Sequence, residues 1–154
     1  MAIRSFKDLE VWQKAMDLAA NVYAVTQTMP PEERFGLTNQ VRRAVTSIPA
    51  NIAEGHGRLY QAEYIRFLSI ARGSLMEVET HILLAERLGF LQPDQLFETK
   101  GLIGQVGRLI NGLLRSLRAN QATGRISETG IDYQSDPQSP TPDPHIHKGV
   151  FNDE

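Results

Sequence analysis

The sequence contains no cysteine, and this absence excludes disulfides, thiol nucleophiles and cysteine-ligated metal sites. It contains no run of about 18 apolar residues, the length that a membrane-spanning helix needs. It also lacks the Glu-x-x-His motif through which helical bundles hold metal pairs, as well as nucleophile-elbow and phosphate-loop motifs. We therefore expect a soluble, cytoplasmic protein that is not an enzyme, holds no metal or cofactor and has no membrane partner.

Charge is distributed unevenly along the chain. Residues 1–120 carry fourteen Lys and Arg against twelve Asp and Glu, whereas residues 121–154 carry two basic residues against six acidic ones. Arg outnumbers Lys twelve to four, and the planar guanidinium fork of Arg suits the recognition of phosphate. A genome whose codons favour Arg would give the same excess, so composition alone leaves the ligand open.

Apolar residues recur at three- and four-residue steps in four segments, which is the spacing of amphipathic helices. The first segment runs from about Ser5 to Thr28, the second covers 37–52, the third covers 60–85 and stops at Gly89, and the fourth starts near Pro93. Short connections between similar lengths favour antiparallel neighbours, so residues 1–120 are predicted to form an all-α, up-down-up-down four-helix bundle. The predicted inner faces are Leu9, Trp12, Met16, Ala19 and Tyr23; Leu37, Val41, Ala44, Val45, Ile48 and Ile52; Tyr60, Tyr64, Phe67, Leu68, Ala71, Leu75, Val78, Ile82 and Ala85; and Leu96, Ile103, Val106, Ile110, Leu113 and Leu117.

Residues 121–154 lose this periodicity. Half of the eight prolines fall in DPQSPTPDPH, among Ser, Asp and Gln, and such a segment buries too little apolar surface to offset its ordering entropy. We expect an acidic, Pro-rich, disordered C-terminal tail. It holds a lone PxxP (137–140) and two histidines (His145 and His147), and both patterns are too common to indicate a specific site.

Two of the predicted helices carry a second apolar stripe away from the inner face. Exposed stripes of this kind usually mark an interface, so we expect a homo-oligomer. The stripes consist of Val11, Leu18 and Val25 in the first helix and Ile65, Met76 and Leu83 in the third. The fourth helix adds four glycines (101, 104, 107 and 112), each of which costs up to about 1 kcal/mol relative to Ala unless another backbone approaches closely.

The stretch SIPANIAEG (47–55) ends the second helical segment in an unusual way. Pro49 has no N–H for the carbonyl of Val45, so a kink is expected there, and the position of the proline ring on the helix does not require it to enter the core. Ser47 or Asn51 is expected to help satisfy polar groups nearby. The glycines of Gly55-His56-Gly57 are expected to let the chain turn left-handed into the third helix.

These motifs resemble a known family. The sequences LTNQVRRAVTSIPANIAEG and FLSIARGSLMEVETHILLAERLGFL, together with SFKDLEVWQKA near the start, are similar to those of the four-helix bundle family of 23S rRNA intervening-sequence proteins. That family also includes the accessory variability determinant of diversity-generating retroelements. The resemblance covers about residues 5–118. It implies a homopentamer of bundles whose basic surface, in the retroelement members, engages a reverse transcriptase and nucleic acid.

The arginines outside the inner stripes are the candidate contacts to RNA or DNA phosphates. They are Arg42, Arg43, Arg66, Arg72, Arg108, Arg115 and Arg118. Ordinary ion pairs, such as Glu63 with Arg66 three residues later, would give the same pattern on a merely solvated face. The alternative function is a structural adaptor that binds proteins and makes no contact with nucleic acid.

Overall fold

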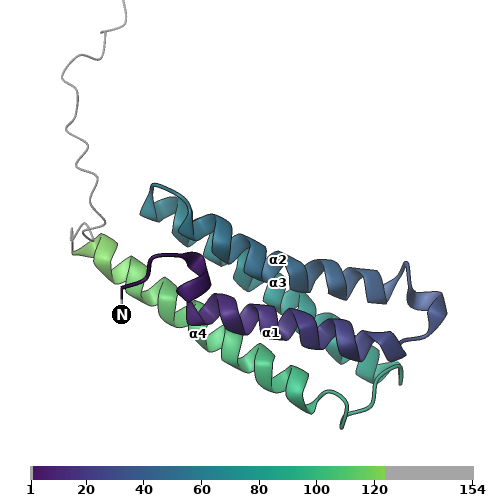
Figure 1. Cartoon of the computed structure of the whole chain (residues 1–154). Coiled ribbons are helices and arrows are strands. Elements are labelled where there is room, and N and C mark those ends of the chain that lie inside the picture. Colours follow the sequence, from purple (N-terminus) through teal and green to yellow (C-terminus); the bar gives the residue numbers. More distant parts are fainter. Residues whose placement is uncertain (1, 124–154) are drawn as a thin grey trace, which may run out of the picture.

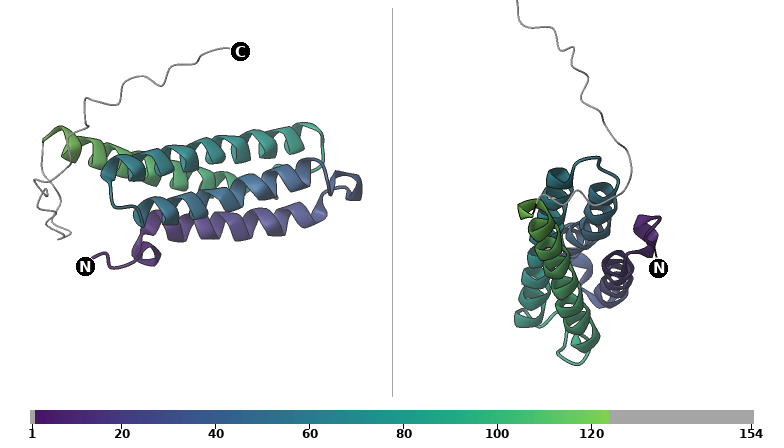
Figure 2. Two further views of the ribbon diagram at one scale, coloured as in Figure 1. Left: turned by 90° about the horizontal axis from the view of Figure 1, so that it is seen from above. Right: turned by 90° about the vertical axis from the view of Figure 1, so that its left-hand side faces the viewer.

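The computed structural model describes residues 2–123, and all the regular structure in this range is helical. The four long helices lie side by side, as Figures 1 and 2 show, so the predicted all-α four-helix bundle is confirmed. They are α1 (Glu10–Val25), α2 (Leu37–His56), α3 (Gln61–Arg87) and α4 (Phe97–Ala122), with short 3-10 turns η1 (Phe6–Asp8), η2 (Thr26–Thr28) and η3 (Pro31–Glu33). The predicted tail, with its PxxP and histidines, lies outside the described residues apart from its first three.

Successive helices run antiparallel and close a ring. Helix α1 packs against α2 and α4, and α3 packs against α2 and α4, with the most extensive contact between α2 and α3. The start of α1, the α2–α3 connection and the end of α4 therefore lie at the same end of the bundle (Figure 1). The side chain of Gln61, at the start of α3, donates a hydrogen bond to the carbonyl of Leu117 near the end of α4.

Helices α2, α3 and α4 face the core largely as their periodicity predicts. The buried apolar residues of these helices and of the N-cap of α4 are Val41, Ala44, Val45, Ile48, Ile52, Leu68, Ala71, Leu75, Val78, Ile82, Ala85, Leu96, Ile103, Val106, Ile110 and Leu114. Tyr60 is exposed and caps α3 instead of packing inside it, while Leu113 and Leu117 are only half-buried. Helix α4 begins at Phe97, four residues later than Pro93 suggested, because residues 93–96 form a separate turn.

The predicted orientation of the first helix is wrong. Ser5 and Asp8 form a capping box, but it caps η1, and the extended backbone of Leu9 delays the start of α1 to Glu10. The core side of α1 consists of Val11, Ala15, Leu18 and Val22. Met16 and Tyr23, predicted to be internal, are 44% and 42% exposed. The core of a single chain therefore takes the Val, Ala and Leu side chains of α1, whereas Met16 and Tyr23 lie outside it.

This orientation also removes two residues from the predicted oligomer surface. Val11 and Leu18 are buried in the core of a single chain and cannot present a face to a second copy. Val25 is half-buried against the core, as Ile65 is on α3. The exposed large apolar side chains of α1 belong to Met16 and Tyr23 instead.

The stretch SIPANIAEG lies entirely within α2, which continues through Pro49 to His56. The ring of Pro49 is buried, although its angular position on the helix did not require this. As predicted, Asn51 donates to the polar groups nearby: its Nδ2 lies 2.8 Å from the Ser47 carbonyl oxygen and 3.0 Å from Ser47 Oγ. Ser47 Oγ in turn lies 2.8 Å from Oγ of Ser74 on α3, so this polar chain joins the two helices.

The glycines of the two helix ends behave differently. Gly55 is helical and buried, and its Cα faces α3 at close range, so the predicted left-handed turn there is wrong. Gly89 has a φ of 74° and ends α3, with the Phe90 N–H donating to the Ala85 carbonyl at 2.9 Å. The predicted stop at Gly89 is therefore confirmed.

Candidate nucleic-acid-binding surface

Charge is segregated along the length of the bundle. We name residues 2–17, 47–74 and 108–123 the basic half; it contains the start of α1, the α2–α3 connection and the end of α4 (Figure 1). It carries nine Lys and Arg against five Asp and Glu. The remainder, residues 18–46 and 75–107, is the acidic half and carries five basic residues against seven acidic ones. An anionic partner is therefore attracted to one half and repelled by the other.

Three exposed arginines of α4 form the most concentrated part of the basic half. Arg108, Arg115 and Arg118 fall within an arc of about 80° when 100° is allowed per residue. No Asp or Glu follows Glu98 in α4, and among residues 2–123 no carboxylate forms an ion pair with any of the three. We name these three residues the arginine face. Because nothing in the described part of the chain neutralises them, they are available to an external anion.

The glycines of α4 place no side chains on the surface beside the arginine face. A Cβ added at Gly101 or Gly112 would meet no atom within 4 Å, and one added at Gly104 would lie 3.4 Å from Nη1 of Arg108. Only Gly107 faces the interior, where a Cβ would lie 3.4 Å from Cδ2 of Leu75. Close approach inside the bundle thus accounts for Gly107. Gly101 and Gly112 leave bare backbone at the surface, and Gly104 is half-buried beside the Arg108 side chain.

The two predicted arginines of α3 are exposed but point in different directions. Arg72 lies on the side of α3 that borders α4, whereas Arg66 lies about 120° away around the helix. The alternative pairing of Glu63 with Arg66 is not present among the described ion pairs. Arg72 therefore adds to the arginine face, and Arg66 extends the basic half around α3.

Arg42 has an internal role that the sequence did not reveal. Its Nε donates to Thr26 Oγ1 at 2.9 Å, its Nη2 donates to the Tyr23 carbonyl at 3.4 Å, and its guanidinium lies 4.7 Å from the centre of the Tyr23 ring. A cation in this position complements the negative end of the α1 dipole. The neighbouring Arg43 is exposed, but both residues lie in the acidic half and are remote from the arginine face.

Arg58 is a basic residue that sequence reasoning missed. It lies at the α2–α3 connection, where Nη2 is 2.6 Å from Glu54 Oε1 and the guanidinium is 4.7 Å from the centre of the Phe67 ring. The i,i+4 spacing of Glu54 and Arg58 was the available signal. Because its charge is already paired, Arg58 contributes less to the basic half than the three residues of the arginine face.

The exposed edge of α3 beside α4, which also carries Arg72, holds the remaining part of the predicted oligomer surface. Met76 and Leu83 are 47% and 48% exposed, and Ile65 is half-buried. Further exposed apolar side chains are Ile70 and Leu84 elsewhere on this helix and Leu88 at its C-cap. A helix with exposed apolar side chains outside its inner face normally has a further partner there.

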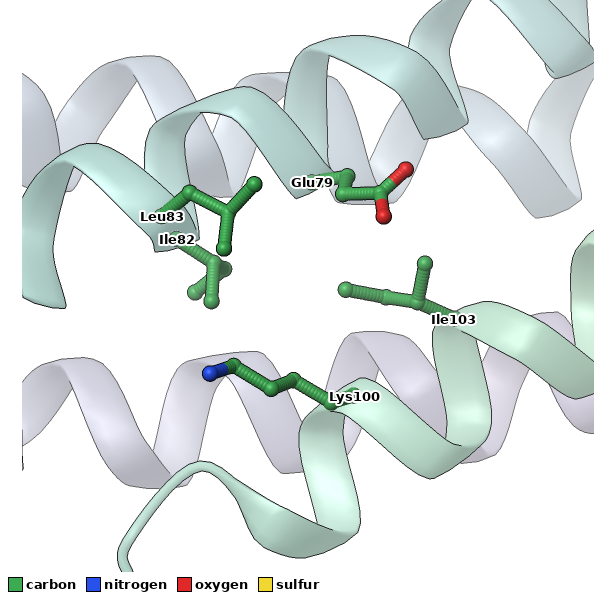
Figure 3. Close-up of a pocket in the computed structure, with 5 residues that line it drawn as sticks. All are labelled: Glu79, Ile82, Leu83, Lys100 and Ile103. Carbon is green, nitrogen blue, oxygen red and sulfur yellow. The ribbon is translucent and has the colours of Figure 1, made fainter. Parts of the chain in front are cut away.

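The features expected of a catalytic or ligand site are sparse in the described range. No three His, Asp or Glu residues within 2–123 are placed to hold a metal ion. A pocket of about 190 Å³ opens between α3 and α4, where Glu79, Ile82 and Leu83 face Lys100 and Ile103 (Figure 3). It is smaller than most small-molecule sites, and the Lys100 amine already pairs with Glu86 at 2.7 Å. Burial raises the pKa of Tyr64 to about 12, so this hydroxyl stays protonated near neutral pH.

The helices of the described range are too short or too polar in composition to cross a lipid bilayer.

Comparison with solved structures finds a protein of unknown function of the S23 ribosomal protein family from Bacteroides thetaiotaomicron. The TM-score is 0.64 at 23% sequence identity, over 68% of this chain and 98% of the other, which shows a shared fold. The search of curated proteins found no match. The sequence profile of one family, described as 23S rRNA-intervening sequence protein, matches residues 7–112. The chain belongs to the 23S rRNA-intervening sequence protein family.

Proposed function

We propose that this protein is a non-catalytic, cytoplasmic scaffold that assembles as a homo-oligomer and binds RNA or DNA through the arginine face. One observation carries the proposal: Arg108, Arg115 and Arg118 are exposed together on a helix that has no carboxylate after Glu98. The RNA named in the description of the family supports a nucleic-acid partner. By the resemblance to retroelement accessory proteins, a reverse transcriptase is the protein partner that such a complex would serve.

The chemistry of arginine supports phosphate as the ligand. Each guanidinium can donate two parallel hydrogen bonds to one phosphate, and these charge-assisted bonds are roughly twice as strong as neutral ones. Oligomerisation would repeat the arginine face in every subunit, so a modest charge per chain becomes an extended basic field. Contacts of this kind do not read base sequence; they fix the position of the backbone.

Replacing the arginine face by glutamine tests this proposal. We expect Arg108→Gln, Arg115→Gln and Arg118→Gln together to weaken binding of labelled RNA about 10- to 30-fold near 0.1 M salt. The slope of log K against log salt should fall by about 2–3, because each lost phosphate contact removes roughly 0.7–0.9. Fluorescence anisotropy across a salt series measures both quantities.

The matched control removes the same charge from the acidic half, through Arg34→Gln, Arg43→Gln and Arg87→Gln. These three arginines are exposed, so the fold should tolerate their replacement. Retention of most of the affinity in this control is expected. An equal loss in both variants would show that only net charge matters, and the arginine face would then not be the site.

Self-association through the exposed edge of α3 beside α4 is the second part of the proposal. Met76 and Leu83 lie within about 20° of each other around the helix, and Ile65 follows the same line. A second copy would remove these side chains from water, at roughly 25 cal/mol for each Å² of apolar surface. The family resemblance implies that five copies form the assembly.

Charged substitutions on this face should dissociate the oligomer. We expect Met76→Glu combined with Leu83→Glu to reduce the mass in solution to that of a single chain, 17.2 kDa, because each interface would bury unpaired carboxylates. Light scattering after size exclusion measures the mass. Met16→Glu combined with Ala20→Glu places the same charge on exposed positions of α1 and should leave the assembly intact. A monomeric unmodified protein would contradict the prediction.

The acidic half favours an adaptor function as the second candidate. Phe35 and Phe97 are 85% and 84% exposed there, and exposed aromatic rings are enriched where proteins dock on one another. Their surroundings repel nucleic acid. If the unmodified protein fails to bind RNA and DNA at low salt, the adaptor function is the better account.

A further inference from the structure

We propose that residues 124–154 of the same chain dock on the arginine face through their carboxylates and compete there with nucleic-acid phosphate. This inference rests on the proposed function, because it concerns regulation of the same surface. The docked segment would neutralise Arg108, Arg115 and Arg118, which form no ion pair with a carboxylate within residues 2–123.

Charge complementarity is the first argument. Residues 124–154 carry Arg125 and Lys148 against six acidic residues, a net charge of -4. The basic half, with nine basic and five acidic residues, has a net charge of +4. The acidic residues are Glu128, Asp132, Asp136, Asp143, Asp153 and Glu154. A guanidinium donates paired hydrogen bonds to carboxylates and phosphates with the same geometry, so the two anions compete directly for the same arginines.

The point of attachment is the second argument. The acidic segment follows directly on Thr123, where the described chain ends, and Arg118, Arg115 and Arg108 lie about 7, 12 and 22 Å back along the helix axis at 1.5 Å per residue. Five residues reach at most about 17 Å and nine reach about 30 Å, so Glu128 and Asp132 span these distances. Covalent attachment over so few residues gives an effective concentration on the order of millimolar.

The strength of the contact makes it a competitor rather than a permanent block. Exposed pairs between single carboxylates and guanidinium groups are individually weak and are screened by salt. A nucleic acid presents a continuous row of phosphates and displaces the segment at a cost in affinity. The expected cost is about 3- to 10-fold at low salt, and it should vanish as salt rises.

Neutralising part of the segment in the full-length chain tests the proposal. The variant carries Glu128→Gln, Asp132→Asn, Asp136→Asn and Asp143→Asn; the control carries Glu32→Gln, Glu77→Gln, Glu79→Gln and Asp94→Asn, four exposed acids of the acidic half. We expect the first variant to bind labelled RNA 3- to 10-fold more tightly near 50 mM salt. In the control, the increase in the logarithm of the RNA affinity should be less than half of that in the first variant. An equal gain in both would overturn the proposal, because it would reflect net charge alone.

A second measurement, made in the absence of nucleic acid, tests whether residues 124–154 dock on the arginine face. The backbone amide chemical shifts of residues 108–123 should differ between the unmodified protein and the neutralised variant, and those of residues 18–46 should not. Unchanged shifts in α4 would overturn the docking even if affinity changed. If neither protein binds RNA or DNA while the shifts differ, the proposed function fails and the docking stands.

Discussion

Leu18→Ala is expected to lower the free energy of unfolding by about 2–5 kcal/mol, because it leaves a cavity in a fully buried part of the core. Leu18 is 0% exposed and belongs to the main apolar cluster, whereas Met16, two residues earlier, is 44% exposed. Met16→Ala should therefore cost less than about 1 kcal/mol. Urea unfolding followed by circular dichroism measures both changes.

The comparison distinguishes the orientation of α1 in the structure from the one its sequence suggested. With Met16 and Tyr23 inside and Leu18 outside, the costs of the two substitutions would be reversed. Because self-association adds to apparent stability, the measurements should be repeated across protein concentrations. A large cost for Met16→Ala that appears only at high concentration would place Met16 at a contact between copies and leave the orientation of α1 unchanged.

The ambiguity of α1 has a physical origin. The helix carries one stripe of Val11, Ala15, Leu18 and Val22 and another that includes Met16 and Tyr23, and both follow three- and four-residue steps. Periodicity identifies an apolar face but does not rank two of them. The choice depends on how each stripe packs against α2 and α4, which periodicity within α1 does not encode.

Where a helix has one dominant stripe, the sequence was sufficient. In α2, the line from Val41 to Ile52 has no competitor, and every member is buried as predicted. The positive φ of Gly89 was predictable because a left-handed residue is the common way to end a helix. The geometry at Pro49 and Gly55 was not, since it depends on how closely α3 approaches α2.

The candidate surface was predictable only in part. That α4 is rich in arginine and poor in acid can be read from its sequence, and the structure adds that its arginines are exposed on one arc. The internal role of Arg42 depends on where α1 ends, and no local pattern indicates that position. The division into basic and acidic halves requires the antiparallel packing of the helices, which places residues 58, 66 and 115 in the same half.

Gly55→Ala is expected to lower the free energy of unfolding by about 1–3 kcal/mol through overpacking. A Cβ at this position would lie 2.8 Å from the Phe67 Cβ and 2.9 Å from the Tyr64 Cδ2, and 3.4 Å from the Tyr64 carbonyl oxygen. The Phe67 Cβ is attached directly to the backbone, so relief requires α2 and α3 to separate. The usual gain from replacing a helical glycine by alanine, up to about 1 kcal/mol, does not offset this strain.

Gly73→Ala provides the matched control, because a Cβ there would meet no atom within 4 Å and the residue is also helical. It should raise the free energy of unfolding by about 0.5–1 kcal/mol. The two substitutions are chemically identical, so opposite signs in the same urea unfolding assay would isolate the close contact between the helices. Stabilisation by both would show that α2 and α3 are farther apart at this end than the structure has them. Since Phe67 lies between Arg66 and Arg72 in the chain, the same contact helps to fix the orientation of α3, which places Arg72 beside α4 and Arg66 about 120° away from it.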